Sequence, residues 1–380
     1  MRSNYKRLGD YIHEVNIRNV ELKATTLLGI NIDKFYMPSV ANIVGTDMTT
    51  YKIVKNGQFA CNRMHVGRDY RLPVALSKSS EVFTVSPAYD VFEVLDTEVL
   101  LPEYLMMWFS RKEYDRNAWF YTDADVRGGL NWKAFCDMQL PVPNFDKQKQ
   151  IVKEYNKLVN RIALKNQLIQ KLEETALAIY RQWFVDYEFP DEEGKSYKSN
   201  GGEMGESELG EIPKGWEVGV LIEMIEIKYG KAYSHLEKGN IPLYGSGGVM
   251  GYVNKVLYDK PTILIPRKGS LNNILYLNKP FWSVDTMFYS ILKKEYNGCY
   301  VYYYLIAMDF NSLNVGSAVP SMTTNYLNNM LIIKPSECVL KKFDKLVRNL
   351  FNQIEFKKMQ NEKLKELQDL LLSKLVTIEN

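Results

Sequence analysis

A repeat with a period of 192 residues constrains this 380-residue chain more than any other feature of its sequence. Each copy has a short apolar run that ends at a proline, Pro143 in the first half and Pro335 in the second. A long helical pattern follows each proline and carries leucine at equivalent places, Leu158 and Leu350. Internal repetition at a fixed period indicates a duplicated structural unit. We therefore expect two related halves.

The helical pattern in each half places apolar residues three or four positions apart, which makes one apolar stripe along a helix. Each helix should span roughly 30 to 35 residues, or about 45 to 55 Å. Two such helices in one chain most simply pack on each other as an antiparallel coiled coil. Polar residues that interrupt the stripes, Lys165, Lys357 and Asn361, can fix the register of such a pair. The alternative is that each helix covers a separate globular core.

The rest of each half is rich in short apolar runs separated by Gly, Asn and Pro, which is typical of strands. Examples are 91–94 in the first half and 262–265 and 287–292 in the second. Short amphipathic helices are expected at 104–109 and 304–310, which align with an offset of 200 residues. The fold class is therefore α+β, with two long helices added.

A glycine-containing acidic segment, residues 191–211, lies between the halves and carries a net charge of −5. It holds little apolar surface to bury, so we expect a flexible connector. Because the whole chain has a net charge of +3, the remainder is left with +8. A basic remainder is compatible with a polyanionic partner.

Four stretches occur in order along the chain: Trp183–Pro190, Leu209–Trp216, the loop pair Tyr244–Gly248 with Arg267–Ser270, and Gly316–Pro320. As an ordered set they resemble the specificity subunits of type I restriction-modification systems. The resemblance covers nearly the whole chain. The first half matches less closely, because Asp125–Leu130 replaces the last stretch and no Arg-Lys-Gly-Ser run is present.

The resemblance implies two target-recognition domains joined by helical spacers that pack antiparallel, with a pseudo-twofold internal repeat. The boundaries expected from the sequence are a first recognition domain at 1–145, a central long helix at 146–190, and a flexible acidic linker at 191–211. A second recognition domain at 212–336 and a C-terminal long helix at 337–380 follow.

The resemblance also implies a function without chemistry in this chain. Each recognition domain would read one half of a bipartite site in double-stranded DNA. Two modification subunits, which use S-adenosylmethionine, would dock on the helices and methylate adenines. In systems that also cleave, restriction subunits would add ATP- and Mg-dependent translocation and cleavage. This chain itself is expected to bind no cofactor.

Specific DNA binding needs cations for phosphates and planar polar side chains for base edges. Two loop-rich stretches, 61–78 and 255–279, concentrate such residues. Including the family-like loops, the candidate DNA-binding residues are Arg63, His65, Arg68, Arg71, Lys78, Arg127, Tyr244, Ser246, Arg267, Lys268, Asn272 and Ser317. The glycine-rich segment 244–251 lacks the Lys and Ser/Thr of a P-loop, so a tight turn is the better interpretation.

Enzyme classes are disfavoured by missing motifs. The chain contains no Pro-Pro pair, which the catalytic motif of adenine methyltransferases requires. A nuclease-like Pro-Asp…Glu-x-Lys pattern at 190–195 lies in the predicted flexible connector rather than on rigid strands. Neither a Gly-x-Ser-x-Gly elbow nor cysteine and histidine spacing for a metal site is present.

Two further expectations concern location and the competing function. The sequence has no run of 18 apolar residues and no signal-peptide pattern at its start, so we expect a cytoplasmic protein without a membrane partner. The alternative function is a coiled-coil adaptor with two protein-binding modules. Salt-dependent binding to duplex DNA distinguishes the two, because an adaptor should lack it.

Overall fold

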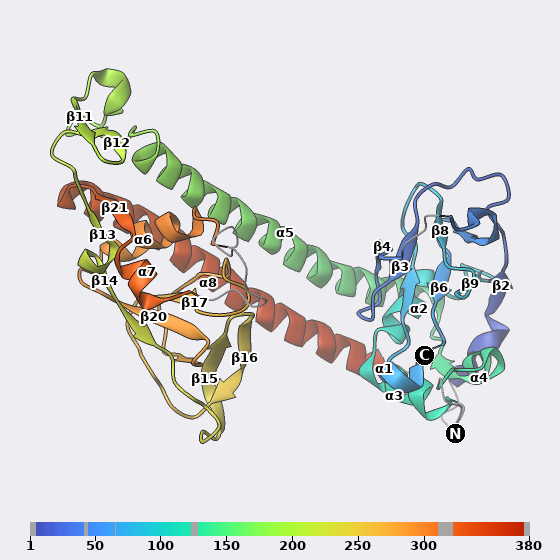
Figure 1. Cartoon of the computed structure of the whole chain (residues 1–380). Coiled ribbons are helices and arrows are strands. Elements are labelled where there is room, and N and C mark those ends of the chain that lie inside the picture. The colour runs from blue at the N-terminus through green and yellow to red at the C-terminus, as the bar shows by residue number, and fades with distance from the viewer. Residues whose placement is uncertain (1–4, 42–44, 65, 123–127, 311–321, 376–380) are drawn as a thin grey trace. The chain divides into compact units, whose positions relative to one another are not determined.

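The computed structural model describes residues 5–41, 45–64, 66–122, 128–310 and 322–375 (Figure 1). The chain divides into two compact units. The first unit comprises residues 1–165 and 359–380, and the second comprises residues 166–358. Residues of both long helices belong to both units.

A four-stranded antiparallel sheet forms the centre of the first unit, in the order β2-β9-β6-β7. Its strands are short and apolar, and Phe59 of β6 lies opposite Phe92 of β9 with their rings stacked at 5.0 Å. Phe109 packs edge-on against both rings. The elements of this unit, besides its share of the long helices, are β1 (Tyr5–Arg7), η1 (Leu8–Asp10), β2 (Ile12–Val15), β3 (Leu28–Ile30), β4 (Tyr36–Pro38), η2 (Met48–Thr50), β5 (Lys52–Val54), β6 (Phe59–Cys61), α1 (Val66–Asp69), β7 (Val74–Leu76), β8 (Phe83–Val85), β9 (Asp90–Val94), α2 (Pro102–Phe109), α3 (Lys112–Phe120), α4 (Trp132–Asp137) and β10 (Gln139–Pro141).

The second unit has a sheet of the same kind, in the order β14-β20-β17-β18, again antiparallel throughout. Its central strand β17 is buried along its whole length. A second sheet, β16-β15-β19, packs beside it through a smaller apolar cluster. The elements of this unit are η3 (Lys198–Asn200), β11 (Met204–Ser207), β12 (Gly210–Pro213), β13 (Glu217–Val220), η4 (Leu221–Glu223), β14 (Ile225–Tyr229), β15 (Lys238–Gly245), β16 (Gly248–Val253), β17 (Thr262–Pro266), β18 (Leu275–Leu277), β19 (Trp282–Ser283), β20 (Met287–Leu292), α6 (Asn297–Ile306), α7 (Thr324–Asn328) and β21 (Leu331–Lys334).

The two units repeat one frame, which confirms the repeat expected from the sequence. In the first unit β1 pairs with β10, and Leu8 N–H donates to the carbonyl of Met138 at 2.8 Å. In the second, β13 pairs with β21, and Leu221 N–H donates to the carbonyl of Met330 at 2.9 Å. The helices α4 and α7 each start at a residue whose side chain caps the first turn, Asn131 or Thr323.

The alignment of the short helices was wrong by one helical turn. Tyr104 in α2 is buried, and its hydroxyl donates to the carbonyl of Pro141 at 3.1 Å. The residue that does the same in the second unit is Tyr300 of α6, which bonds the carbonyl of Ile333 at 2.7 Å. The sequence comparison had matched Tyr104 with Tyr304. Because tyrosines recur through α6, apolar periodicity alone could not choose between successive turns.

The long helices are α5 (Phe145–Phe184) and α8 (Glu337–Lys374), drawn in green and red in Figure 1. In the first unit the hydroxyl of Tyr155 on α5 accepts from Gln368 of α8 at 2.7 Å, and Lys165 donates to Gln360. In the second unit Trp183 of α5 packs against Phe343 of α8. Early residues of each helix thus meet late residues of the other, which confirms antiparallel pairing.

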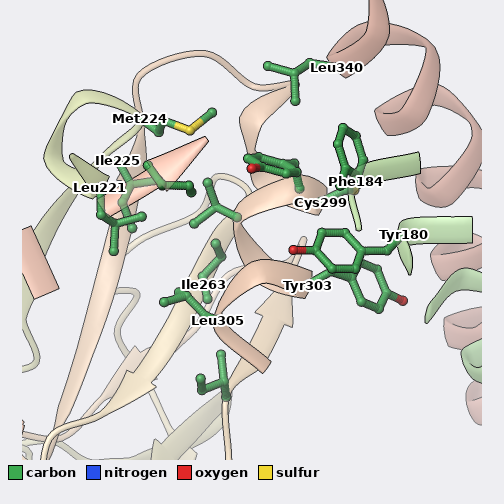
Figure 2. Packing of buried hydrophobic residues seen from close by; sticks show 14 of the residues in the cluster. Tyr180, Phe184, Leu221, Met224, Ile225, Ile263, Cys299, Tyr303, Leu305 and Leu340 are labelled. Atoms are coloured by element: carbon green, nitrogen blue, oxygen red, sulfur yellow. The ribbon is translucent and has the colours of Figure 1, made fainter. Parts of the chain in front are cut away.

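The largest apolar core lies in the second unit, where α5 and α8 meet the sheet and α6. Figure 2 shows Tyr180 and Phe184 of α5 beside Cys299 and Tyr303 of α6. The rings of Tyr180 and Tyr303 stack at 5.6 Å. The long helices are therefore part of the core and fix the sheet, rather than lying outside it.

The expectation of an unstructured connector at 191–211 was wrong. Within it β11 and β12 form an antiparallel hairpin, and Pro190 bridges to Ser196. Aromatic contacts order the segment: Phe189, which precedes it, stacks on Tyr197 within it at 4.6 Å and on Trp216 beyond it at 5.0 Å. The prediction rested on the acidic residues and overlooked the aromatic residues in and around the segment.

No helix in the described ranges is both long and apolar enough to cross a membrane.

Candidate nucleic-acid interface

Two of the family-like loops touch in the second unit. The side-chain amide of Asn273 donates to the backbone carbonyl of Ser246 at 2.7 Å. Gly269 has a φ of +83°, and a Cβ placed there would lie 2.8 Å from the Ser246 hydroxyl oxygen. The loop after β17 and the turn between β15 and β16 therefore meet at a point where glycine is required.

The residues that border segment 311–321 are fastened to the same place. On one side, the backbone N–H of Phe310 donates to the side-chain oxygen of Asn272 at 3.0 Å, and the Asn272 amide donates to Asp309 at 3.1 Å. On the other side, Met322 N–H donates to the carbonyl of Arg267 at 2.7 Å. Three segments distant in sequence thus converge on 267–273. We call the described part of this cluster, residues 244–248, 267–273 and 322–324, the second-unit loop cluster.

Cationic, aromatic and hydroxyl groups lie together at this cluster. The Arg267 guanidinium lies 5.5 Å from the ring centroid of Tyr229 and donates to the carbonyl of Asp285 at 3.1 Å. Lys268 beside it is exposed. The Tyr229 ring is 52% exposed, and its hydroxyl is 3.5 Å from that of Thr324. Such groups suit phosphates and base edges.

Two candidates in this unit have internal roles. Tyr244 is only 5% exposed and packs edge-on against Phe281, so its ring belongs to the core rather than to a surface. Burial also raises the pKa of its hydroxyl. Asn272 uses both ends of its amide to hold the chain before residue 311, as described above. Ser317 lies outside the described residues.

In the first unit Arg63 is enclosed. Its Nε donates to Asp90 at 2.6 Å, and its Nη1 donates to the carbonyl of Leu130. The guanidinium lies 5.4 Å from the Trp132 ring, and the side chain is 19% exposed. Burial alone would lower the pKa of Arg63, but neighbouring acidic groups, Asp90 foremost, raise it overall. Sequence reasoning counted this cation as a DNA contact and missed its structural partners.

The exposed arginines Arg68 and Arg71 lie on or just after α1, and each is paired with a carboxylate. Arg68 contacts its neighbour Asp69 through two hydrogen bonds of 2.6 and 2.9 Å. Arg71 contacts Asp33 at 2.7 Å. These pairs lie at the surface, where they are weak and open to exchange for phosphate.

Asp33 belongs to a turn that is itself anchored. The next residue, Lys34, is buried and contacts Asp115 at 2.7 Å as well as the carbonyl of Phe109. Burial lowers the pKa of Lys34, although Asp115 opposes that effect. The turn between β3 and β4 is therefore fixed beside Arg71.

Lys78 does not join the other cations. It follows β7, whose Leu76 pairs with Phe59 at the start of β6, whereas Arg63 follows the end of β6. The exposed Lys78 is thus at the opposite end of this strand pair. His65 and Arg127 lie outside the described residues, although Gly67 N–H donates to the carbonyl of Gly128 at 2.7 Å.

An exposed aromatic group lies beside α1, and its part at 119–121 was missed by the sequence analysis. Tyr70 is 61% exposed, has a φ of +56° and lies 5.3 Å from the ring of Trp119. Phe120 is 77% exposed and Tyr121 48%. A positive φ in a bulky residue is uncommon and marks a constrained position. The run of three aromatic residues at 119–121 was the available sequence signal.

Comparison with known proteins finds similarity to proteins of type I restriction systems. Residues 213–366 match the type I restriction modification DNA specificity domain. The chain is 21% identical over 427 aligned residues to the type I restriction enzyme HindI specificity subunit of Haemophilus influenzae, with 90% of this chain and 91% of that protein covered. The chain therefore carries a match to this DNA specificity domain in its second half and resembles type I specificity subunits over most of its length.

Further similarities agree with this. The type I restriction enzyme MjaIX specificity subunit of Methanocaldococcus jannaschii is 24% identical over 316 residues, covering 74% of this chain and 70% of that protein. Among solved structures, the crystal structure of the type I restriction-modification system S subunit from M. genitalium aligns with a TM-score of 0.58 and 15% identity. That alignment covers 98% of this chain and 95% of the other, so the two chains share a fold.

Proposed function

We propose that this specificity subunit reads a bipartite DNA target, with each unit contacting one half of the site. The observation that carries the proposal is the duplicated frame with different surfaces. Equivalent loops follow β6 in the first unit and β17 in the second, yet the side chains on the two loops differ. Similar frames with unlike loops suit two modules that recognise different base sequences.

The chemistry belongs to partner subunits in this proposal. This chain would contribute recognition alone, and two modification subunits would use S-adenosylmethionine to methylate adenines. Restriction subunits, where present, would use ATP and Mg.

The long helices are proposed as the docking surface for the modification subunits. Apolar side chains that are large and exposed recur along both: Leu164, Leu168, Leu346, Phe356, Met359, Leu367 and Leu370. Phe356 is 59% exposed and Met359 62%. Apolar groups left open on paired helices favour a protein partner.

A methylation map of the source strain, with the gene intact and deleted, tests the proposed function. We expect loss of one split motif, in which two defined short sequences flank an unspecified spacer. A change confined to a single continuous motif would contradict a bipartite reader.

The adaptor alternative makes a different prediction for the purified complex. Duplex DNA binding should weaken steeply with salt, by about a thousandfold or more between 50 and 200 mM if six or more phosphates are contacted. An adaptor would show no such binding and would leave the methylation map unchanged.

A further inference from the structure

Strand register places two arginines at equivalent positions in the two units. In the first sheet Ile12 pairs with Val94, and three residues before Val94 stands Val91, which pairs with Ala60. In the second sheet Ile225 pairs with Leu292, and Tyr289, three residues before Leu292, pairs with Leu264. Three residues beyond Ala60 and Leu264 stand Arg63 and Arg267.

The backbone makes the same bond at both positions. The carbonyl of Arg63 accepts from Leu130 N–H at 2.9 Å, and that of Arg267 accepts from Met322 N–H at 2.7 Å. Leu130 and Met322 are 192 residues apart, which is the period of the repeat. Each is followed directly by the N-cap residue of a short helix. The equivalence therefore rests on backbone bonding and not on sequence likeness.

The two side chains are used differently. Arg63 has its charge compensated by Asp90 at 2.6 Å and is enclosed by Leu130 and Trp132. Arg267 donates to one carbonyl at 3.1 Å and lies over the exposed ring of Tyr229. Among the described residues, no carboxylate lies within ion-pair distance of Arg267. The Arg267 guanidinium is therefore not ion-paired with a described carboxylate at the second-unit loop cluster.

We propose that these equivalent arginines have different roles in recognition. Arg267 contacts DNA directly in the second half-site, whereas Arg63 is a positioning residue for the first half-site. Arg63 ties Asp90 on β9 to Leu130 and so fixes the segment Gly128–Leu130 against β6. It acts on the first half-site through that segment and contributes no net charge to phosphate binding. This inference rests on the proposed function.

The salt dependence of binding separates the two roles. Each phosphate neutralised by a protein cation contributes about −0.9 to the slope of log K against log salt concentration. Arg267→Gln should reduce the steepness of that slope by about one if the contact is a phosphate. If Arg267 reads a base instead, the same variant should relax preference at one position of the second half-site, while Arg267→Lys keeps the slope.

Arg63→Gln should leave the slope unchanged but weaken discrimination at the first half-site by about tenfold. Asp90→Asn should have the same effect, because it breaks the same ion pair. The double variant should be no worse than either single one, since the two residues act as one unit. Arg63→Lys, which keeps a cation beside Asp90, should recover part of the discrimination.

The experiment uses the full chain assembled with its modification subunits. Fluorescence anisotropy would compare its mapped target with two duplexes, each carrying one scrambled half-site, between 50 and 200 mM salt. Lys78→Gln, on the opposite end of the β6–β7 pair, is the control for loss of a surface cation. Thermal unfolding of each variant identifies a folding defect, in which case Arg63→Lys and Asp90→Asn carry the test.

The outcomes are distinct. A slope that falls by about one in Arg63→Gln with half-site discrimination intact would show that Arg63 is a phosphate contact and overturn its positioning role. Unchanged slope and unchanged preference in Arg267→Gln would overturn the direct contact. A wild-type complex without preference for any split target would instead refute the proposed function itself.

Discussion

Gly67 and Gly128 approach each other more closely than side chains would permit. A Cβ on Gly67 would lie 2.7 Å from the Gly128 Cα and 2.9 Å from its carbonyl oxygen. The two backbones are joined by one hydrogen bond of 2.7 Å. Together with the bond from Leu130 to Arg63, this contact holds the basic turn α1 against residues 128–130.

We therefore predict that Gly67→Ala destabilises the protein by about 1 to 3 kcal/mol, because backbone atoms on both sides must shift. Gly129→Ala is the matched control, since its Cβ would meet nothing nearer than the Arg63 carbonyl at 3.8 Å. Denaturant unfolding of both variants measures the difference. Equal stability of the two would show that the contact yields without cost.

At the scale of residues, the sequence indicated which side chains were candidates but did not indicate which of them lie at the surface and which have partners inside the fold. Arg63 and Arg267 both stood out as cations in loop-rich stretches, yet one is enclosed by Asp90 and Trp132 while the other is not. Tyr244 read as a loop aromatic but fills the core. Such assignments depend on partners tens of residues away, which local composition does not reveal.

At the scale of elements, the helix α6 contains four tyrosines that are buried or partly buried. Tyr300, Tyr302, Tyr303 and Tyr304 follow one another with one gap, and all pack against the long helices or β21. Burial raises the pKa of Tyr302 and of Tyr304 to about 12. These phenols therefore stay protonated in the folded chain at a pH where the unfolded chain would ionise them.

This predicts alkaline destabilisation of the second unit. Because the folded state binds more protons than the unfolded one, the stability is fully present below pH 10.0, the ordinary value, and is lost as pH rises toward 12. Denaturant unfolding at pH 9 to 11.5, followed with phenolate absorbance, measures the loss. Tyr302→Phe should flatten the profile, whereas Tyr233→Phe, at an exposed site, should not.

Elements with their own periodicity were predictable. The stripes of α5 and α8 and the apolar runs of β9, β17 and β20 are visible in the sequence and occur where expected. The hairpin β11–β12 was missed because its order comes from Phe189, Tyr197 and Trp216 at its borders. One-turn errors, as between Tyr300 and Tyr304, arise where similar residues repeat along a helix.

At the scale of the whole molecule, charge is distributed unevenly along the chain. Residues 191–211 carry −5 in a chain whose net charge is +3. In the folded protein three of these carboxylates, Glu206, Glu208 and Glu211, are exposed on or beside the hairpin β11–β12. Fixed negative charge opposes the approach of a polyanion.

We predict that replacing these three glutamates with glutamine raises nonspecific duplex affinity about two- to tenfold at 50 mM salt, and less at 200 mM where screening is stronger. The matched control replaces the same residues with aspartate, which keeps the charge. Anisotropy titrations with a duplex lacking the target measure both. Identical affinities of the two variants would show that charge at this hairpin has no such role.

The chain segments that make up each unit also determine when that unit can be completed during synthesis. The core of the first unit includes Leu372 and Leu375, far along the chain, whereas the second unit is complete by residue 358. During synthesis the first unit therefore cannot bury its apolar core until residues 372–375 have emerged from the ribosome. By then all residues of the second unit have been synthesised. A messenger truncated after that point would yield a finished second unit attached to an unfinished first one.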